Sequence, residues 1–222
     1  MSLNKRLQFL RETMARNAGP LIAAVCAQAE EQKAHLASEE GEVLHCPGSV
    51  PDETLVTADG KEQSVRELIA GKPAVILFFR GDWCPFSTTS MRALEAIRAD
   101  LAARDIVMIG VTPRHHAALA EAAAKNLLGY PLLTDPEQKL TEAMGIRART
   151  IDEMIRLYES QGIDLAELNE SGDWYLPLEA TFLVRPDGSI CCASAFPHPG
   201  RRMEPAEIRD RMIEMLKQPA AG

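Results

Sequence analysis

The sequence contains one cysteine in a setting suited to redox chemistry, Cys84, within the segment Arg80 to Ser87 (RGDWCPFS). Cys84 is followed by Pro85, and because proline favours the first position of a helix, we expect Cys84 to be the N-cap residue of a helix. At that position the free backbone N–H groups and the positive end of the helix dipole favour a thiolate over a thiol. A thiolate is the form of cysteine that attacks peroxides and disulfides.

Two residues of this segment are candidates to assist Cys84. The Arg80 cation would stabilise a thiolate and the charge that develops on a leaving group. Ser87, three residues after the cysteine, would donate a hydrogen bond to the same sulfur. Ordinary interpretations stay open: Cys84 as a small buried hydrophobe, and Arg80 as a strand-end cation that pairs with Asp82 or with solvent.

The elements that would position this segment are a strand, a helix and a second strand. Residues 74–79 are apolar without alternation, which is typical of a strand buried on both faces. Apolar residues recur at helical spacing over 91–101, and 105–111 form a second apolar run. This order predicts a βαβ unit with Cys84 at the carboxyl end of a parallel strand, where open α/β sheets bind their ligands.

Helices are expected at both ends of the chain. Residues 2–38 predict a two-helix extension, because Pro20 interrupts a helix-forming run at a natural first-turn position. Residues 205–217 place their apolar side chains on one side and predict a last helix. A shift in composition near residue 40 predicts two parts, a helical extension at 1–40 and a domain at 41–222.

Capping and turn signals divide the domain further. Ser64 and Glu67 form a capping box that starts a short helix. Each of two prolines follows a capping residue, which predicts helices at 113–127 and 136–144 with a short strand near 131–134 between them. The remaining expected elements are a helical insertion at 151–170 and a hairpin with strands at 181–185 and 189–196.

The stretch AVILFFRGDWCPFSTTSMRALEAI resembles the active-site segment of the alkyl hydroperoxide reductase / thiol-specific antioxidant family, particularly its peroxiredoxin-like members with Arg-Gly-x-Trp-Cys-Pro-[Tyr/Phe]-Cys. Other segments, such as ATFLVRPDGSI, resemble the same family over roughly residues 44–216. The resemblance implies an α/β, thioredoxin-like fold, a central mixed sheet flanked by helices, with an N-terminal helical extension. It also implies that Cys84 is the nucleophile. The substrate contacts would come from Trp83, Pro85, Thr112, Glu179 and Ala180.

Two positions depart from the family pattern. Ser87 occupies the place of the second active-site cysteine, so no disulfide can form within this motif. Glu179 replaces a proline that is usually cis, and a cis bond before a non-proline residue costs roughly 2.5 to 4 kcal/mol, so we expect a trans bond or a reshaped wall. The Glu179 carboxylate would also raise the pKa of Cys84 and oppose the helix. An alternative alignment, to the Pro-x-x-x-Thr-x-x-Cys motif of typical peroxiredoxins, places the reactive cysteine at Ser87; we prefer the alignment that keeps a sulfur at the N-cap.

These features predict a thiol-dependent antioxidant oxidoreductase that reduces peroxides or exchanges disulfides through Cys84 alone. Attack on a peroxide gives a sulfenic acid, and attack on a disulfide gives a mixed disulfide. Because Ser87 cannot resolve either product, an external thiol, glutathione or a thioredoxin-like protein, would complete the cycle, or less readily Cys46. The competing hypothesis is a redox-inactive thioredoxin-fold module with a binding or regulatory role.

Composition and charge exclude several classes of protein. The net charge of −8 repels nucleic acid and anionic lipid, and no apolar stretch approaches the roughly 20 residues of a membrane-spanning helix. A charged N-terminus and five cysteines without a disulfide framework predict a cytoplasmic location. No cofactor is expected, and no metal, because His115 and His116 lack ligand spacing. A homodimer is compatible with the resemblance.

Two further pairs of neighbouring residues have ordinary interpretations. Cys191 and Cys192 are adjacent within a strand, so we expect one in the core and one at the surface. Arg201 and Arg202 are expected at the surface unless the tail of the chain folds back. Neither pair is predicted to take part in the chemistry.

Overall fold

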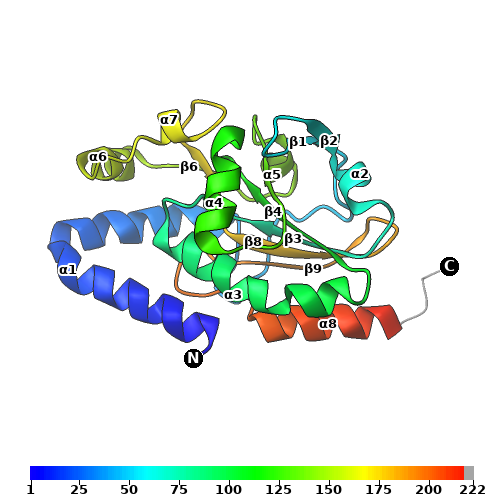
Figure 1. The fold of residues 1–222 in the computed structure, drawn as a ribbon. Helices are drawn as coiled ribbons and strands as arrows, with labels where there is room; N and C mark the ends of the chain where they lie inside the picture. Colours follow the sequence, from blue (N-terminus) through cyan, green and yellow to red (C-terminus); the bar gives the residue numbers. More distant parts are fainter. Residues whose placement is uncertain (218–222) are drawn as a thin grey trace.

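The centre of the molecule is a seven-stranded sheet with the order β2-β1-β5-β4-β3-β8-β9 (Figure 1), given by a computed structural model that describes residues 1–217. Its middle strand, β3 (Ala74–Phe78), pairs in parallel with β4 (Val107–Thr112) and antiparallel with β8 (Ala180–Val184). Every residue of β3 is buried, which confirms a strand covered on both faces. Residues 218–222, the end of the predicted domain, lie outside the described residues.

The outer strands complete a mixed sheet, as predicted. β5 (Leu132–Thr134) pairs in parallel with β4. β1 (Thr54–Val56) and β2 (Glu62–Ser64) form an antiparallel hairpin, and β1 joins the sheet antiparallel to β5. β9 (Ile190–Ala195) forms the predicted hairpin with β8 at the other edge.

Helices cover both faces of the sheet (Figure 1). They are α2 Val65–Ile69, α3 Pro85–Ala102, α4 Leu119–Asn126, α5 Lys139–Ala143 and α8 Pro205–Lys217. Successive residues of a strand point to opposite faces. Val75 and Leu77 of β3 pack among α3, α4 and α8, whereas Ile76 and Phe78 pack among α2 and α5. This alternation explains why a continuous apolar run is needed at the centre.

The N-terminal extension folds into two helical segments joined by a kink, as expected. α1 (Leu3–Glu31) is interrupted at Gly19, whose φ of 72° and ψ of 168° are not helical. Pro20 then starts the second segment, where the missing N–H is tolerated. A short 3₁₀ helix, η1 (Gln32–His35), ends the extension.

The predicted insertion contains two helices, α6 (Asp152–Ser160) and α7 (Leu165–Leu168). Two strands that were not predicted, β6 (Arg147–Arg149) and β7 (Tyr175–Pro177), pair antiparallel and close the insertion at its base. Strands of three residues are too short to show a clear alternation in the sequence. Helix α6 contacts α1, so the insertion and the extension lie side by side (Figure 1).

The prediction that a helix starts at Pro113 is wrong. The chain bends at Pro113, and Arg114 then pairs with Asn169 of the insertion in place of a helical turn. A short 3₁₀ helix, η2 (His116–Ala118), precedes α4. Tertiary pairing has therefore overridden a local capping signal.

The predicted start at Pro136 is also early, since α5 begins at Lys139. Gln138 adopts a left-handed conformation with φ 55°. The Asp135 carboxylate accepts hydrogen bonds from the backbone N–H of Thr141 at 2.8 Å and from its hydroxyl at 2.7 Å. Asp135 thus caps the later helix from a distance instead of starting one at the next residue.

Cys191 and Cys192 do not divide between core and surface as predicted. The register of β8 and β9 shifts here, with Leu183 opposite Cys192 and Val184 opposite Ile190. Cys191 is the extra residue of a β-bulge, which breaks the alternation of side chains. Both cysteines are half-buried and pack against the cluster that contains α8.

None of the helices in residues 1–217 combines the length and the hydropathy that crossing a bilayer requires.

Candidate active site

Cys84 lies between the end of β3 and the start of α3, as the N-cap residue of that helix. Its backbone N–H donates to the Gly81 carbonyl at 3.3 Å, and its carbonyl accepts from the Thr88 N–H at 3.0 Å. Gly81 has φ 140°, and a Cβ at this position would lie 2.7 Å from Trp83 Nε1. The turn therefore requires glycine, and it fixes the sulfur at the helix N-terminus.

The N-terminal extension covers the Cys84 side chain. Only 3% of Cys84 is exposed. It shares a hydrophobic cluster with Leu3 and Leu7 of α1 and with Phe86 of α3. Leu3 and Leu7 are themselves buried, which shows that the first segment of α1 is closely packed over the sulfur.

Trp83 connects this cluster to the insertion. Its ring packs against the residues around Cys84 and meets Tyr158 of α6 edge to face, with the ring centroids 5.4 Å apart. The sequence predicted Trp83 as a residue of the site, but it gave no signal for Tyr158. Tyr158 lies 75 positions from Trp83 in the chain, on an amphipathic helix whose sequence does not indicate which element it packs against.

With α1 packed over Cys84, here called the closed arrangement, the pKa of the Cys84 thiol is raised. This contradicts the prediction that the helix N-terminus favours a thiolate at Cys84. Burial raises the pKa of the thiol most, and the charge of Glu179 raises it further. The Arg80 cation and the Ser87 backbone N–H act in the opposite direction and are outweighed. Burial, which the sequence did not reveal, is thus the main cause of the raised pKa, ahead of the predicted effect of Glu179.

Glu179 belongs to a buried ion pair. Arg202 Nε donates to Glu179 Oε2 at 2.8 Å, and the Ser87 hydroxyl donates to Glu179 Oε1. Burial opposes ionisation of Glu179, but the charges of Arg202 and Arg80 and the Ser87 hydrogen bond outweigh it and lower its pKa. The expected surface position of Arg202 is wrong, because the tail folds back, whereas Arg201 is exposed. A buried carboxylate needs a cation, and the position of Glu179 just before the apolar strand at 181–185 was the available signal for a partner such as Arg202.

Arg80 lies close enough to Cys84 and to the Tyr158 phenol for their charges to interact. Its Nε is buried and has no hydrogen-bond partner among the described residues. Asp82, its alternative partner from the sequence, pairs instead with Arg114 at 2.9 Å. The guanidinium therefore keeps a donor available at the site.

Thr112 and Ala180, two other predicted site residues, lie at the same end of the central strands of the sheet. Phe78, at the end of β3, is opposite both Ala180 and Val111, and Thr112 follows Val111 at the end of β4. Thr112 and Ala180 are buried, whereas Pro85, the first residue of α3, is exposed. No peptide bond in residues 1–217 is cis, so the bond before Glu179 is trans, as expected.

Cys46, the candidate for a resolving thiol within the chain, packs against the cluster on the α2 and α5 face of the sheet. Its thiol donates to the Pro47 carbonyl at 3.4 Å. Burial and then the charge of Cys192 raise its pKa. Cys26 of α1, in contrast, shares the neighbour Tyr158 with Cys84.

Lys33 of η1 is a cation that sequence reasoning missed. Burial lowers its pKa most, and the charges of Arg80 and Arg202 lower it further, to about 7.

Because the pKa of Lys33 is lower in the folded state than in the unfolded state, the unfolded chain binds more protons between about pH 7 and 10. In that window the wild-type free energy of unfolding should rise with pH, by up to about 1.4 kcal/mol per unit, relative to Lys33→Met. Urea unfolding at pH 7, 8 and 9 measures this difference, with Lys125→Met on α4 as the exposed control. Parallel pH profiles for wild type and Lys33→Met would contradict it.

Comparisons with known proteins identify the family of this chain. A model of the AhpC/TSA family matches residues 48–192. A Haemophilus influenzae protein named as a peroxiredoxin, bcp, is 28% identical over 103 residues, which are 46% of this chain and 66% of the relative, just under two thirds of its length.

Solved structures are also similar. Peroxidoxin BcpB from Mycobacterium tuberculosis aligns with a TM-score of 0.57 and 15% identity over 80% of this chain and 95% of that chain. Reduced Prx3 from Vibrio vulnificus, solved in complex with hydrogen peroxide, aligns with a TM-score of 0.59 and 15% identity over 74% of this chain and 96% of that chain. At this identity the likeness concerns the fold, and it confirms the fold expected from the sequence.

Proposed function

Because the chain belongs to the AhpC/TSA family, we propose that it is a thiol-dependent antioxidant oxidoreductase that reduces a peroxide through Cys84. The observation that carries this proposal is the position of the Cys84 sulfur at the N-terminus of α3 with the Arg80 cation beside it. The name of the Haemophilus influenzae relative agrees with peroxide as the substrate. Trp83, Pro85, Thr112 and Ala180 would line the approach of the peroxide.

In the proposed reaction the Cys84 thiolate attacks one oxygen of the peroxide. The S–O bond forms as the O–O bond breaks, the sulfur is oxidised to a sulfenic acid, and the leaving oxygen takes a proton to become an alcohol or water. Arg80, with its free Nε, stabilises the thiolate and the charge on the leaving oxygen. Glu179 stays paired with Arg202 and accepts a hydrogen bond from the Ser87 hydroxyl.

A second thiol must complete the cycle, because Ser87 has no sulfur. An external thiol, glutathione or a thioredoxin-like protein, attacks the sulfenic acid to give a mixed disulfide and water. A further thiol then attacks the mixed disulfide. Cys84 is released as a thiol, and the two reductant sulfurs leave joined in a disulfide. Five unpaired cysteines in the chain agree with a reducing compartment such as the cytoplasm.

The reaction requires the first segment of α1 to leave Cys84, because a sulfur with 3% exposure cannot meet a peroxide or a reductant. Opening removes the burial that most raises the pKa of Cys84, so access and thiolate formation are coupled. The segment is held by the tail of the chain. Glu204 accepts hydrogen bonds from the backbone N–H groups of Leu3 at 2.9 Å and Asn4 at 2.8 Å.

Glu204→Ala should therefore expose Cys84. A hydrogen bond to a charged group is worth about 1.5–3 kcal/mol, so the rate of Cys84 alkylation should rise about 10- to 100-fold. Mass-spectrometric mapping of iodoacetamide-labelled peptides over time measures this rate. Glu207→Ala, an exposed carboxylate three positions further along in the first turn of α8, is the matched control. Equal rates in both variants would show that the α1 contact with Glu204 does not govern access.

The alternative function, a redox-inactive binding module, is favoured by the burial of Cys84 and its raised pKa. Trapping with a sulfenic-acid probe separates the two functions. Under the enzyme proposal, one equivalent of hydrogen peroxide modifies Cys84 first, and the Glu204→Ala variant reacts faster. If Cys84 stays reduced in both proteins while Cys191 or Cys192 is oxidised, the binding module is the better description.

A further inference from the structure

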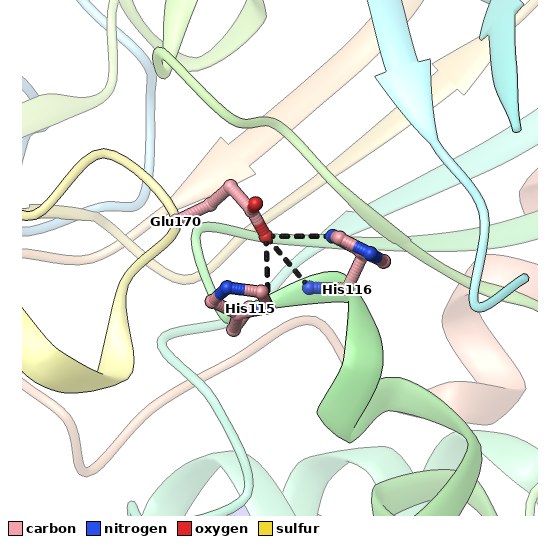
Figure 2. Close-up of side chains that lie close together, drawn as sticks. All are labelled: His115, His116 and Glu170. Atoms are coloured by element: carbon pink, nitrogen blue, oxygen red, sulfur yellow. Dashed lines mark hydrogen bonds and ion pairs between the residues drawn. The ribbon is translucent and has the colours of Figure 1, made fainter. Parts of the chain in front are cut away.

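A second cluster of reactive side chains lies away from the Cys84 sulfur. His115 and His116, after β4, face Glu170, which follows α7 in the insertion (Figure 2). Glu170 Oε2 lies 3.2 Å from His115 Nδ1 and 2.9 Å from His116 Nδ1. One donor atom from each of the three residues can be chosen so that all lie within 4.8 Å of one another.

The backbone holds these residues together independently of their side chains. The His115 N–H donates to the Leu168 carbonyl at 3.0 Å, and the Glu170 N–H donates to the Pro113 carbonyl at 2.9 Å. These two bonds join residues 113–115, after β4, to residues 168–170, at the end of α7. The donor set is therefore preorganised, which is what a metal site requires of its scaffold.

The chemistry of the donors matches a transition metal. Imidazole nitrogen and carboxylate oxygen are ligands of Zn²⁺ at about 2.0–2.2 Å in tetrahedral geometry, which places neighbouring ligand atoms about 3.3–3.6 Å apart. The distances from Glu170 Oε2 to the two Nδ1 atoms, 3.2 and 2.9 Å, are shorter than this spacing, so small side-chain rotations would bring the three atoms to it.

We propose that His115, His116 and Glu170 form a binding site for a divalent transition-metal ion, with Zn²⁺ as its ordinary occupant. The ligands are the two Nδ1 atoms and the Glu170 carboxylate, and water fills the remaining coordination. On binding, His116 gives up its Nδ1 hydrogen bond to Glu170, and each imidazole binds as the neutral ring with its proton on Nε2. The side chains of His115, His116 and Glu170 are 47%, 31% and 21% exposed, so an ion can enter from solvent.

The ion ties the insertion to the end of β4. The same insertion carries Tyr158, which packs on Trp83 beside Cys84. Bound Zn²⁺ therefore strengthens the attachment of the insertion. It takes no part in the proposed peroxide reaction, so the site stands or falls independently of that function.

Titration of the reduced full-length protein with ZnCl₂ by calorimetry tests the proposal. We expect one site that His116→Ala and Glu170→Gln each weaken at least about tenfold. His35→Ala, a substitution of an exposed histidine in η1, should bind like the wild type. Absence of zinc binding by the wild-type protein, or equal affinity in all four proteins, overturns the proposal.

The five cysteines are the competing ligands, and Co²⁺ distinguishes them from the histidines. A thiolate bound to Co²⁺ gives an intense near-ultraviolet charge-transfer band, whereas nitrogen and oxygen ligands do not. We expect the one-equivalent Co²⁺ complex to lack this band and to lose its visible absorption in His116→Ala. An intense thiolate band at one equivalent would assign the ion to cysteine and overturn the proposal. Loss of the site in Glu170→Gln with unchanged circular dichroism would exclude misfolding as the cause.

Discussion

Cys84→Ser is expected to abolish peroxide consumption by the reduced protein in the presence of glutathione or a thioredoxin system. The reaction needs a sulfur that accepts an oxygen atom, and a serine hydroxyl at the same N-cap cannot be oxidised in this way. The rate should fall to that of the buffer and reductant alone. Loss of peroxide followed continuously by a colorimetric assay measures it.

Cys191→Ser is the matched control for this variant. Cys191 is a free, half-buried thiol whose Sγ donates to the Leu183 carbonyl at 3.2 Å, and it is not part of the cluster around Cys84. Its replacement should leave the rate unchanged. Equal rates for Cys84→Ser and the wild type would remove Cys84 from the mechanism, whichever reductant is used. Comparison of the two reductants with the wild type identifies the one that resolves the sulfenic acid.

Arg202→Leu should strongly destabilise the fold, because it leaves the Glu179 carboxylate buried without its cation. The Glu179 side chain is 2% exposed, and that of Arg202 is 9% exposed. Removal of one partner from a buried pair costs about 3–5 kcal/mol. Urea unfolding at pH 7 measures the loss, and an unchanged m-value shows that the variant unfolds from the same compact state.

Arg201→Leu is the control for Arg202→Leu, because it removes the same positive charge from the neighbouring position without breaking the buried ion pair. Arg201 is the exposed neighbour, with its guanidinium over the Phe196 ring at 4.9 Å, and its replacement should cost less than about 1 kcal/mol. The double variant Glu179→Leu/Arg202→Leu should recover stability relative to Arg202→Leu, since the buried carboxylate is removed together with its partner. Equal losses for Arg201→Leu and Arg202→Leu would contradict the buried pair.

The Glu179 ion pair also has a consequence for Cys84. A proline at this position would bring no charge, whereas Glu179 brings a carboxylate that raises the pKa of the thiol. The carboxylate is kept ionised by Arg202 from the tail, and the same tail holds α1 through Glu204. The tail thus contributes to both features that keep the sulfur protonated and covered in the closed arrangement.

Local structure near Cys84 was predictable, because it depends on residues close together in the chain. The N-cap position of Cys84 follows from Pro85 and the apolar residues on either side. The capping box of Ser64 and Glu67 is present with both of its hydrogen bonds. Helix α8 likewise follows from the spacing of its apolar residues.

The state of the sulfur was not predictable, since it depends on residues far apart in the chain. Ser87 and Glu179 are 92 positions apart, and Leu3 and Glu204 are 201 apart. Cap and helix preferences extend over about one turn and do not encode which of many distant segments will pack on a site. The N-terminus of α3 favours a thiolate by its local geometry, but the helix packed over it removes the water that ionisation needs, and burial determines the sign of the pKa shift.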